Sequence, residues 1–413
     1  MPTIDPITPQ PHLHAFAGYG IELEYMIVAR DTLAALPVAD RLLTGSDGEP
    51  VNEIEAGELA WSNELVLHVV EFKTNGPAPS LVPLAARFAE AVATVNQGLA
   101  PMGGMLLPTA MHPLFDPDSE TRLWPHGQNE IYAAYDRIFQ CRGHGWSNLQ
   151  SMHINLPFFD DAEFVRLHAA IRAVLPLIPA LAAASPLVEG HASGWMDSRL
   201  RYYRDNQRHI PEIAGRIVPE AIASIEDYGQ RILEPMYRAV AAHDPDGILA
   251  EDWLNSRGAI ARFERQTIEI RIIDIQECPA ADLAIAEAVV GLVRWIYHDD
   301  RRLAAAQTLG TEDLADQLFA AAREGSAVRF DRVDWLALFD VDRPMEGATL
   351  WRELVGRIEL SDAASGILLE MIDRGSLAEA ILDRLGRAPT GETVTACYRE
   401  LATCLAQNRL FRS

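Results

Sequence analysis

The residues best suited to chemistry lie in one short segment, Thr267–Asp274 (TIEIRIID). In a β-strand, alternation puts Glu269 and Arg271 on one face and isoleucines on the other. The isoleucine face is typical of a core, whereas burying an acid beside a guanidinium is costly unless something uses them. The same alternation near the start of the chain puts Glu22 and Glu24 on one face. Clustered carboxylates favour a site for divalent cations, which prefer oxygen ligands.

Each acidic candidate also has a simpler interpretation. Glu22 and Glu24 would need no ligand on a solvated edge strand, but their apolar neighbours equally suggest a central strand. Glu71 lies in a dense apolar run and requires a partner, either a metal ion or Lys73 two residues later. Glu64 falls on the opposite face from Glu71 by strict alternation, so either a β-bulge intervenes or Glu64 precedes the strand.

One histidine and one basic segment complete the set of candidates. His153 alternates with Ser151 and Asn155 on a polar strand face, where a single histidine is more often structural than a ligand. Imidazole together with carboxylates suits Mn²⁺ or Mg²⁺ as well as Zn²⁺. The arginines at 199, 201 and 204 form either a solvated helix face or a clamp for phosphate or carboxylate oxygens.

The elements that must position these residues are strands separated irregularly by helices, which favours the α+β class. We expect strands at about 18–29, 64–74, 102–107 and 149–157 and around Glu269, and helices at 82–99, 129–141, 160–184, 212–245 and 281–297. Residues 1–15 and 43–60 are predicted to be irregular. We expect two domains, 1–300 and a helical C-terminal appendage at 301–413, where the composition changes and no strand signal is found.

Composition and charge limit the classes of function. The formal net charge is −24, which disfavours binding to nucleic acid or to anionic membranes. No apolar run of transmembrane length and no secretion signal are visible, so we expect a cytoplasmic protein whose four cysteines are free thiols. Lys73 is the single lysine, which excludes a P-loop and leaves arginine, backbone amides and metal to hold any phosphates.

Taken in order, the segments resemble the glutamate–cysteine ligase family 2, carboxylate–amine ligases of the glutamine synthetase superfamily. The resemblance spans about residues 18–300, and its specificity lies in the ordered set of motifs. These are Gly20–Glu24 (GIELE), Val69–Thr74 (VVEFKT), His112-Pro113, Leu181–Gly190 (LAAASPLVEG) with Ser198-Arg199, and Thr267–Arg271 (TIEIR) continuing to Asp274. One departure is clear, because the family's H-x-H strand reads Ser151-x-His153 here.

The resemblance implies a glutamine synthetase-like antiparallel sheet with helices on one face and an active face that binds ATP and two or three Mg²⁺ ions (or Mn²⁺). Carried over by position, Glu24, Glu64 and Glu71 would hold one metal, and Glu22, His153 and Glu269 another. Arg271 would neutralise the transferring phosphate and Arg199 would bind phosphate or substrate carboxylate, which makes both catalytic candidates. Arg201 and Lys73 are further candidates for cofactor binding.

We therefore expect an ATP-dependent ligase that forms an amide or γ-glutamyl bond through an acyl phosphate. The expected substrates are small amino acids, glutamate or a relative among them, and a homo-oligomer is compatible with the sequence. Two alternatives stay open. A metal-dependent amide hydrolase would use the same glutamates and histidine to activate water, and a non-catalytic binding protein would keep only the scaffold.

Overall fold

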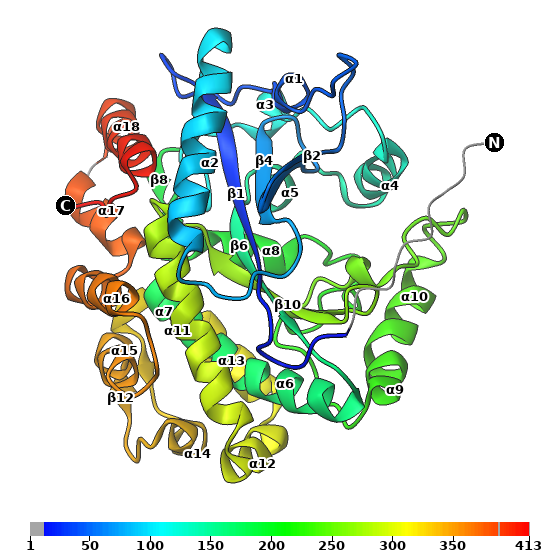
Figure 1. Ribbon diagram of the computed structural model, residues 1–413, viewed down its shortest axis with the longest axis vertical. Coiled ribbons are helices and arrows are strands. Elements are labelled where there is room, and N and C mark those ends of the chain that lie inside the picture. Colours follow the sequence, from blue (N-terminus) through cyan, green and yellow to red (C-terminus); the bar gives the residue numbers. More distant parts are fainter. Residues whose placement is uncertain (1–11, 387–388, 413) are drawn as a thin grey trace.

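The computed structural model describes residues 12–386 and 389–412. Most of the predicted irregular lead-in, 1–15, therefore lies outside the described residues. At the centre is an eight-stranded antiparallel sheet in the order β2, β3, β4, β1, β6, β10, β9, with β5 pairing with β1 (Figure 1). The strands are β1 Gly20–Ala29, β2 Glu53–Ala56, β3 Leu59–Asn63, β4 Val69–Thr74, β5 Gly104–Leu107, β6 Ser151–Pro157, β9 Ala259–Arg262 and β10 Thr267–Asp274.

One layer of helices covers the apolar face of this sheet and further helices flank its polar face, so the predicted α+β class is confirmed. Up to residue 297 they are α1 Ala39–Leu42, α2 Leu84–Leu99, α3 Pro117–Glu120, α4 Asn129–Phe139, α5 His144–Ser147, α6 Asp161–Val174, α7 Ile178–Ala182, α8 Ser198–Asp205, α9 Ile225–Tyr228, α10 Glu234–Val240 and α11 Pro279–Tyr297. A small hairpin joins β7 Leu187–Val188 to β8 His191–Ala192.

Strand β1 shows how alternation builds two environments from one segment. Ile21 and Leu23 are fully buried and pack in a core with side chains of α2, α6 and α11. Glu22 and Glu24 point to the opposite face, where no helix layer from this core covers them. Farther along that opposite face, Met26 joins a second core that includes residues of α17 (Leu377–Leu385) and α18 (Gly391–Gln407).

Two predictions of local structure in the first 300 residues were wrong. Residues 43–60 contain most of a hairpin rather than only a loop, since β2 and β3 pair around the two-residue turn at Gly57. This hairpin ends the sheet, and its first strand is only four residues long and mostly exposed, too short for a clear periodic signal. The helix predicted for 212–245 begins only at Ile225, because the chain before it takes left-handed conformations at Gly215 and Ile217 and then meets Pro219.

The segment Asp161–Ala182 is long and apolar enough to qualify as a membrane span by length and hydropathy, but 89% of that window is buried inside the fold. It comprises α6, a short 3₁₀ turn at Leu175–Leu177 and α7, with Pro176 and Pro179 at the junctions. Its apolar character is explained by packing against α11 and the sheet. This burial is typical of a core helix of a globular protein.

The chain after residue 300 is mainly helical, as predicted, and its helices lie along one side of the molecule (Figure 1). Besides α17 and α18, they are α12 Asp300–Thr308, α13 Thr311–Glu324, α14 Val333–Leu336, α15 Gly347–Val355 and α16 Asp362–Arg374. A two-residue hairpin, β11 Arg329–Phe330 with β12 Met345–Glu346, corrects the expectation of no strand there. Its strands are too short to leave a periodic signal.

Two buried tryptophans fasten this C-terminal region to the preceding core. The Trp335 indole donates to the backbone carbonyl of Ala173 at 2.8 Å, and the Trp351 indole donates to that of Leu177 at 2.9 Å. Both rings belong to the same hydrophobic core as the sheet residues of β1. The predicted boundary at residue 300 is therefore crossed by a continuous core, and the division into two domains stays a prediction.

We predict that Trp351→Ala lowers the free energy of unfolding by about 3–5 kcal/mol, because a fully buried ring is replaced by a cavity. Trp351→Phe, which keeps an aromatic ring but loses the indole hydrogen bond, should cost less. Urea unfolding followed by circular dichroism measures both variants. Wild-type stability of Trp351→Ala would show that this ring does not fasten the two regions, and two separate wild-type transitions would support the domain boundary.

Candidate active site

A cavity of about 530 Å³ lies over the polar face of the sheet. Its walls come from the strands below and from α4, α5, α8 and the loops beside β9. Nine of the ten predicted site residues line this one cavity although they are spread over 250 positions of sequence. They are Glu22, Glu24, Glu64, Glu71, Lys73, His153, Arg199, Glu269 and Arg271.

The strand register explains why these residues meet. Glu22 of β1 pairs with His153 on one side and with Lys73 on the other, and Glu24 pairs with Glu71. Residues that pair directly across antiparallel strands project from the same face of a sheet. Glu64 lies in the loop between β3 and β4, because β4 starts only at Val69, so the second of the two explanations for its spacing is correct.

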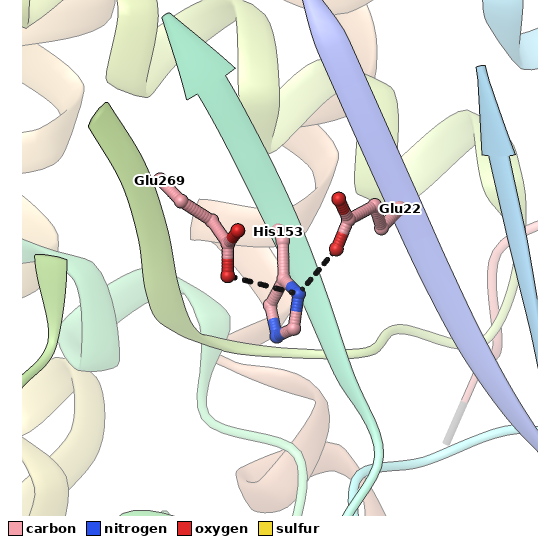
Figure 2. A group of neighbouring side chains, drawn as sticks. All are labelled: Glu22, His153 and Glu269. Atoms are coloured by element: carbon pink, nitrogen blue, oxygen red, sulfur yellow. Dashed lines mark hydrogen bonds and ion pairs between the residues drawn. The ribbon is translucent and has the colours of Figure 1, made fainter. Parts of the chain in front are cut away.

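Glu22, His153 and Glu269 converge from three neighbouring strands (Figure 2). Their ligand atoms all lie within 4.8 Å of one another, and all three side chains are buried. His153 Nδ1 is 2.7 Å from Glu22 Oε2 and 3.8 Å from Glu269 Oε1. Among the residues that the structure describes, this is the one group of histidine and acidic side chains that meets this distance limit. One nitrogen and two carboxylates at this spacing fit a divalent cation.

Strong electrostatic coupling accompanies this geometry. Burial opposes the charged form of both partners, yet the hydrogen bond between them and the surrounding carboxylates raise the pKa of His153 to about 9. Despite its burial, the hydrogen bond and charge of His153 lower the pKa of Glu22 to about 2. In the metal-free protein, an imidazolium therefore supplies the positive charge at this point.

The second acidic set also faces the cavity but is less compact. Glu71 Oε2 accepts a hydrogen bond from Ser62 Oγ at 2.6 Å, and Glu24 Oε2 accepts one from the backbone N–H of Ser151 at 2.7 Å. Burial and then the charges of Glu24 and Glu71 raise the pKa of Glu64 well above its usual range. Burial and the charge of Glu22 likewise raise the pKa of Glu71 to about 7. Carboxyls that resist ionisation here indicate a shortage of positive charge.

Lys73 forms the ion pair with Glu71 that the sequence allowed. Its ammonium lies 3.4 Å from Glu71 Oε2, which is the simple ion pair considered from the sequence, and 2.6 Å from Glu53 Oε2 of β2. It also lines the cavity. The single lysine therefore shares its charge between two carboxylates at the margin of the site.

Arg271 lies beside Glu269, with its Nε 3.0 Å from Glu269 Oε1. The pairing of β10 with β6 shifts between Ile270 and Ile273, so Arg271 sits in a bulge opposite His153. Bulges commonly redirect side chains near active sites. Here the bulge leaves Arg271 partly exposed to the cavity while Glu269 is almost fully buried.

The two other predicted arginines differ from expectation. Arg199 lines the cavity, but its side chain is 2% exposed and its Nε donates to Asp274 Oδ1 at 2.6 Å. Arg201 does not line the cavity, and its guanidinium lies over the rings of Trp195 and Tyr202. Residues two apart on a helix are rotated by about 200°, so the sequence pair could not face one ligand together.

The sequence analysis missed two arginines and the aromatic side chains that form one wall of the cavity. Arg262 Nη1 donates to Glu269 Oε2 at 2.9 Å, and Arg265 lies 3.6 Å from Glu22 Oε1. Recognising β9 would have revealed Arg262, because its pairing with Thr267 puts both on the Glu269 face. The rings that line the cavity are Tyr132, Tyr135, Trp146, Tyr203 and Trp253. No local pattern marks them, since they come from α4, α5, α8 and a loop.

Comparisons with known proteins identify the family and the fold. The sequence profile of Glutamate-cysteine ligase family 2 (GCS2) matches residues 19–393. An uncharacterized protein of Archaeoglobus fulgidus is 33% identical over 377 residues, covering 91% of this chain and 95% of its own. A putative glutamate–cysteine ligase 2-3 of Rubrobacter xylanophilus is 27% identical over 344 residues, 82% of either chain.

Two solved structures show the same fold at low sequence identity. Glutamate–cysteine ligase of Francisella tularensis, in complex with AMP, gives a TM-score of 0.61 at 12% identity over 98% of this chain and 91% of that one. A bifunctional glutathione synthetase from Pasteurella multocida gives 0.56 at 15% identity, over 95% of this chain and 52% of that one.

The profile match covers most of the chain and both metal sets predicted from the sequence. It confirms the expectation of an ATP-dependent ligase that forms carbon–nitrogen bonds. From its sequence profile, its curated relatives and its fold, the chain belongs to the glutamate–cysteine ligase family 2.

Proposed function

We propose that this protein joins the carboxylate of glutamate or a related amino acid to an amine, through an acyl phosphate formed with ATP. The observation that carries the proposal is the convergence of Glu22, His153 and Glu269 beside Arg271 on the floor of one cavity. Support for the substrates comes from the putative glutamate–cysteine ligase relative, and support for the nucleotide comes from the AMP bound to the structural neighbour.

We propose that Glu22, His153 and Glu269 hold one Mg²⁺ or Mn²⁺ ion and that Glu24, Glu64 and Glu71 hold another. Five carboxylates and one imidazole are hard ligands of the kind these ions prefer. The raised pKa values of Glu64 and Glu71 support this assignment, because a cation would stabilise their ionised forms. When bound, such ions would supply positive charge that neutralises the phosphate oxygens during transfer.

The chain's own residues would bind the phosphate oxygens, orient them and neutralise their charge. Arg271 can meet phosphate oxygens, because it lines the cavity and its side chain keeps an exposed portion beside Glu269. Arg262 and Arg265 add positive charge next to Glu269 and Glu22. Phosphoryl transfer requires positioning and charge neutralisation more than a protein nucleophile, so this set is chemically sufficient.

The sequence assigned Arg199 to phosphate or carboxylate binding, and the geometry supports a different role. Its guanidinium is paired with buried Asp274, and its Nη2 lies 3.4 Å from the backbone carbonyl of Arg271. We therefore assign Arg199 to positioning strand β10 around Arg271. A cytoplasmic location, small amino-acid substrates and a homo-oligomer remain predictions.

We predict that divalent metal stabilises the folded protein, because a ligand that binds only the native state raises its stability by about 2.7 kcal/mol at a concentration of 100 Kd. Thermal unfolding would be followed with EDTA and then with Mg²⁺ or Mn²⁺ in the presence of ATP. The melting temperature should rise with either metal. An unchanged melting temperature under all these conditions would contradict the metal assignment.

We predict that Glu269→Gln and Arg271→Ala each lower turnover by about 10²–10³, the usual cost of removing one electrostatic group from a transition state. ADP formation with glutamate and a panel of amines measures turnover. Arg352→Ala on α15 is a matched control, because Arg352 lies at the surface paired with Asp373. Normal turnover in either active-site variant would remove that residue from the mechanism.

We predict that substrate labelled with ¹⁸O in its carboxylate transfers one ¹⁸O to the released phosphate. The reason is that an acyl phosphate keeps one carboxylate oxygen on phosphorus when the amine displaces it. Mass spectrometry of phosphate and nucleotide reads the result. Label in AMP would instead indicate an adenylated intermediate, and amide cleavage without use of ATP would support the hydrolase alternative.

A further inference from the structure

Ser151, where the family pattern has a histidine, joins the two predicted metal sets. It begins β6 and lines the cavity, and the β1–β6 register continued by one position brings it opposite Glu24. Its hydroxyl lies 3.0 Å from Glu24 Oε2 and 2.9 Å from His153 Nε2. Its backbone N–H also donates to Glu24 Oε2 at 2.7 Å. A 4% exposed hydroxyl thus contacts one ligand from each set.

The direction of these hydrogen bonds follows from the number of protons available. A serine hydroxyl has one proton to donate, and an ionised carboxylate can only accept. The Ser151 proton therefore points to Glu24, and Ser151 Oγ is left to accept a hydrogen bond. Its neighbour His153 Nε2 must then be the donor. In the metal-free imidazolium both ring nitrogens carry a proton, and Nδ1 donates to Glu22 Oε2. In the neutral ring that a metal would bind, the hydroxyl of Ser151 would keep the remaining proton on Nε2.

The opposite nitrogen faces the first metal set. His153 Nδ1 lies 2.7 Å from Glu22 Oε2 and 3.8 Å from Glu269 Oε1, within the cluster of ligand atoms (Figure 2). A histidine binds metal through the nitrogen that lacks a proton, and the hydrogen bond of the other nitrogen selects which one that is. The hydroxyl of Ser151 thus presents Nδ1 to Glu22 and Glu269.

We propose that Ser151 is a positioning residue, which fixes the ring and tautomer of His153 so that Nδ1 is the metal-binding nitrogen. This inference rests on the proposed metal-dependent function. It gives the departure from the family's histidine pattern a role, because a short hydroxyl on β6 bridges Glu24 of the neighbouring β1 and His153 of its own strand.

The same contacts show why Ser151 is not assigned as a nucleophile. Ser151, His153 and Glu22 form a chain that resembles a serine–histidine–acid triad. In such a triad the serine donates its proton to the histidine, which acts as the base. Here the Ser151 hydroxyl donates its hydrogen bond to a second carboxylate, Glu24. In the hydrogen bond between Ser151 and His153, the imidazole is therefore the donor and the hydroxyl the acceptor.

Metal affinity tests the proposal directly. Mn²⁺ alone would be titrated into wild type, Ser151→Ala and Ser151→Thr, with free Mn²⁺ measured by electron paramagnetic resonance. Ser151→Ala should bind Mn²⁺ about 10–100-fold more weakly, the usual effect of removing a hydrogen-bond partner of a ligand, and Ser151→Thr should restore binding. Ser147→Ala, a fully buried serine in α5 that does not line the cavity, should bind like wild type.

A second measurement separates positioning from a general structural role. Nitrogen-15 NMR of histidine-labelled, Mg²⁺-loaded protein reports which ring nitrogen carries the proton, and the signal lost in His153→Gln identifies the ring. Wild type should show a protonated Nε2, and Ser151→Ala should lose that preference. Equal Mn²⁺ affinity and an unchanged tautomer in Ser151→Ala would overturn the role of Ser151 alone. Failure of wild type to bind Mn²⁺ would overturn the metal-dependent function and this inference with it.

Discussion

The mutual repulsion of five carboxylates, four of them buried and the fifth, Glu64, half-buried, is the interaction around which this site is built. Glu22, Glu24, Glu64, Glu71 and Glu269 share one cavity, and a carboxylate removed from water is costly unless it is paired, hydrogen-bonded or protonated. All three forms of stabilisation occur in the metal-free protein. An imidazolium and arginines pair with some of these groups, serine hydroxyls bond others, and Glu64 and Glu71 hold their protons to unusually high pH.

Such a cluster persists only if the scaffold that carries it cannot relax. The sheet supplies this rigidity, because each acidic strand buries its alternate apolar residues in the large core beneath. Slipping β1 by one residue would put Ile21 and Leu23 into the cavity and the glutamates into the core. The hydrophobic face therefore fixes the register, and the register fixes the distances between carboxylates.

The sequence allowed prediction of those parts of the site that lie on regular strands. Alternation located Glu22, Glu24, His153 and Glu269, and burial of the intervening isoleucines confirmed it. Arg262 was missed because β9 is only four residues long, and Arg201 was misplaced because a run of basic residues does not reveal helix rotation.

Longer-range features were beyond single-sequence reasoning for a different reason. The aromatic wall gathers rings from α4, α5, α8 and a loop, whose meeting depends on tertiary packing rather than on local spacing. The hairpin β2–β3 was hidden because its first strand has only four residues and is mostly exposed at the sheet margin. Glu64 was assigned from the family resemblance, and it lines the cavity. Its place in the loop before β4 became clear only from the start of that strand at Val69.

Arg199 and Ser151 show that hydrogen-bond partners assign roles more securely than residue type does. An arginine suggests a phosphate ligand, yet the buried carboxylate of Asp274 already occupies the Nε of Arg199. A serine in place of a histidine suggests a lost ligand, yet its hydroxyl touches a carboxylate of one set and the imidazole of the other. In this highly charged cavity, a group whose hydrogen-bond donors are already paired positions the neighbouring side chains and is not available to bind a ligand. The groups left to meet a ligand are those, such as Arg271, that remain partly exposed.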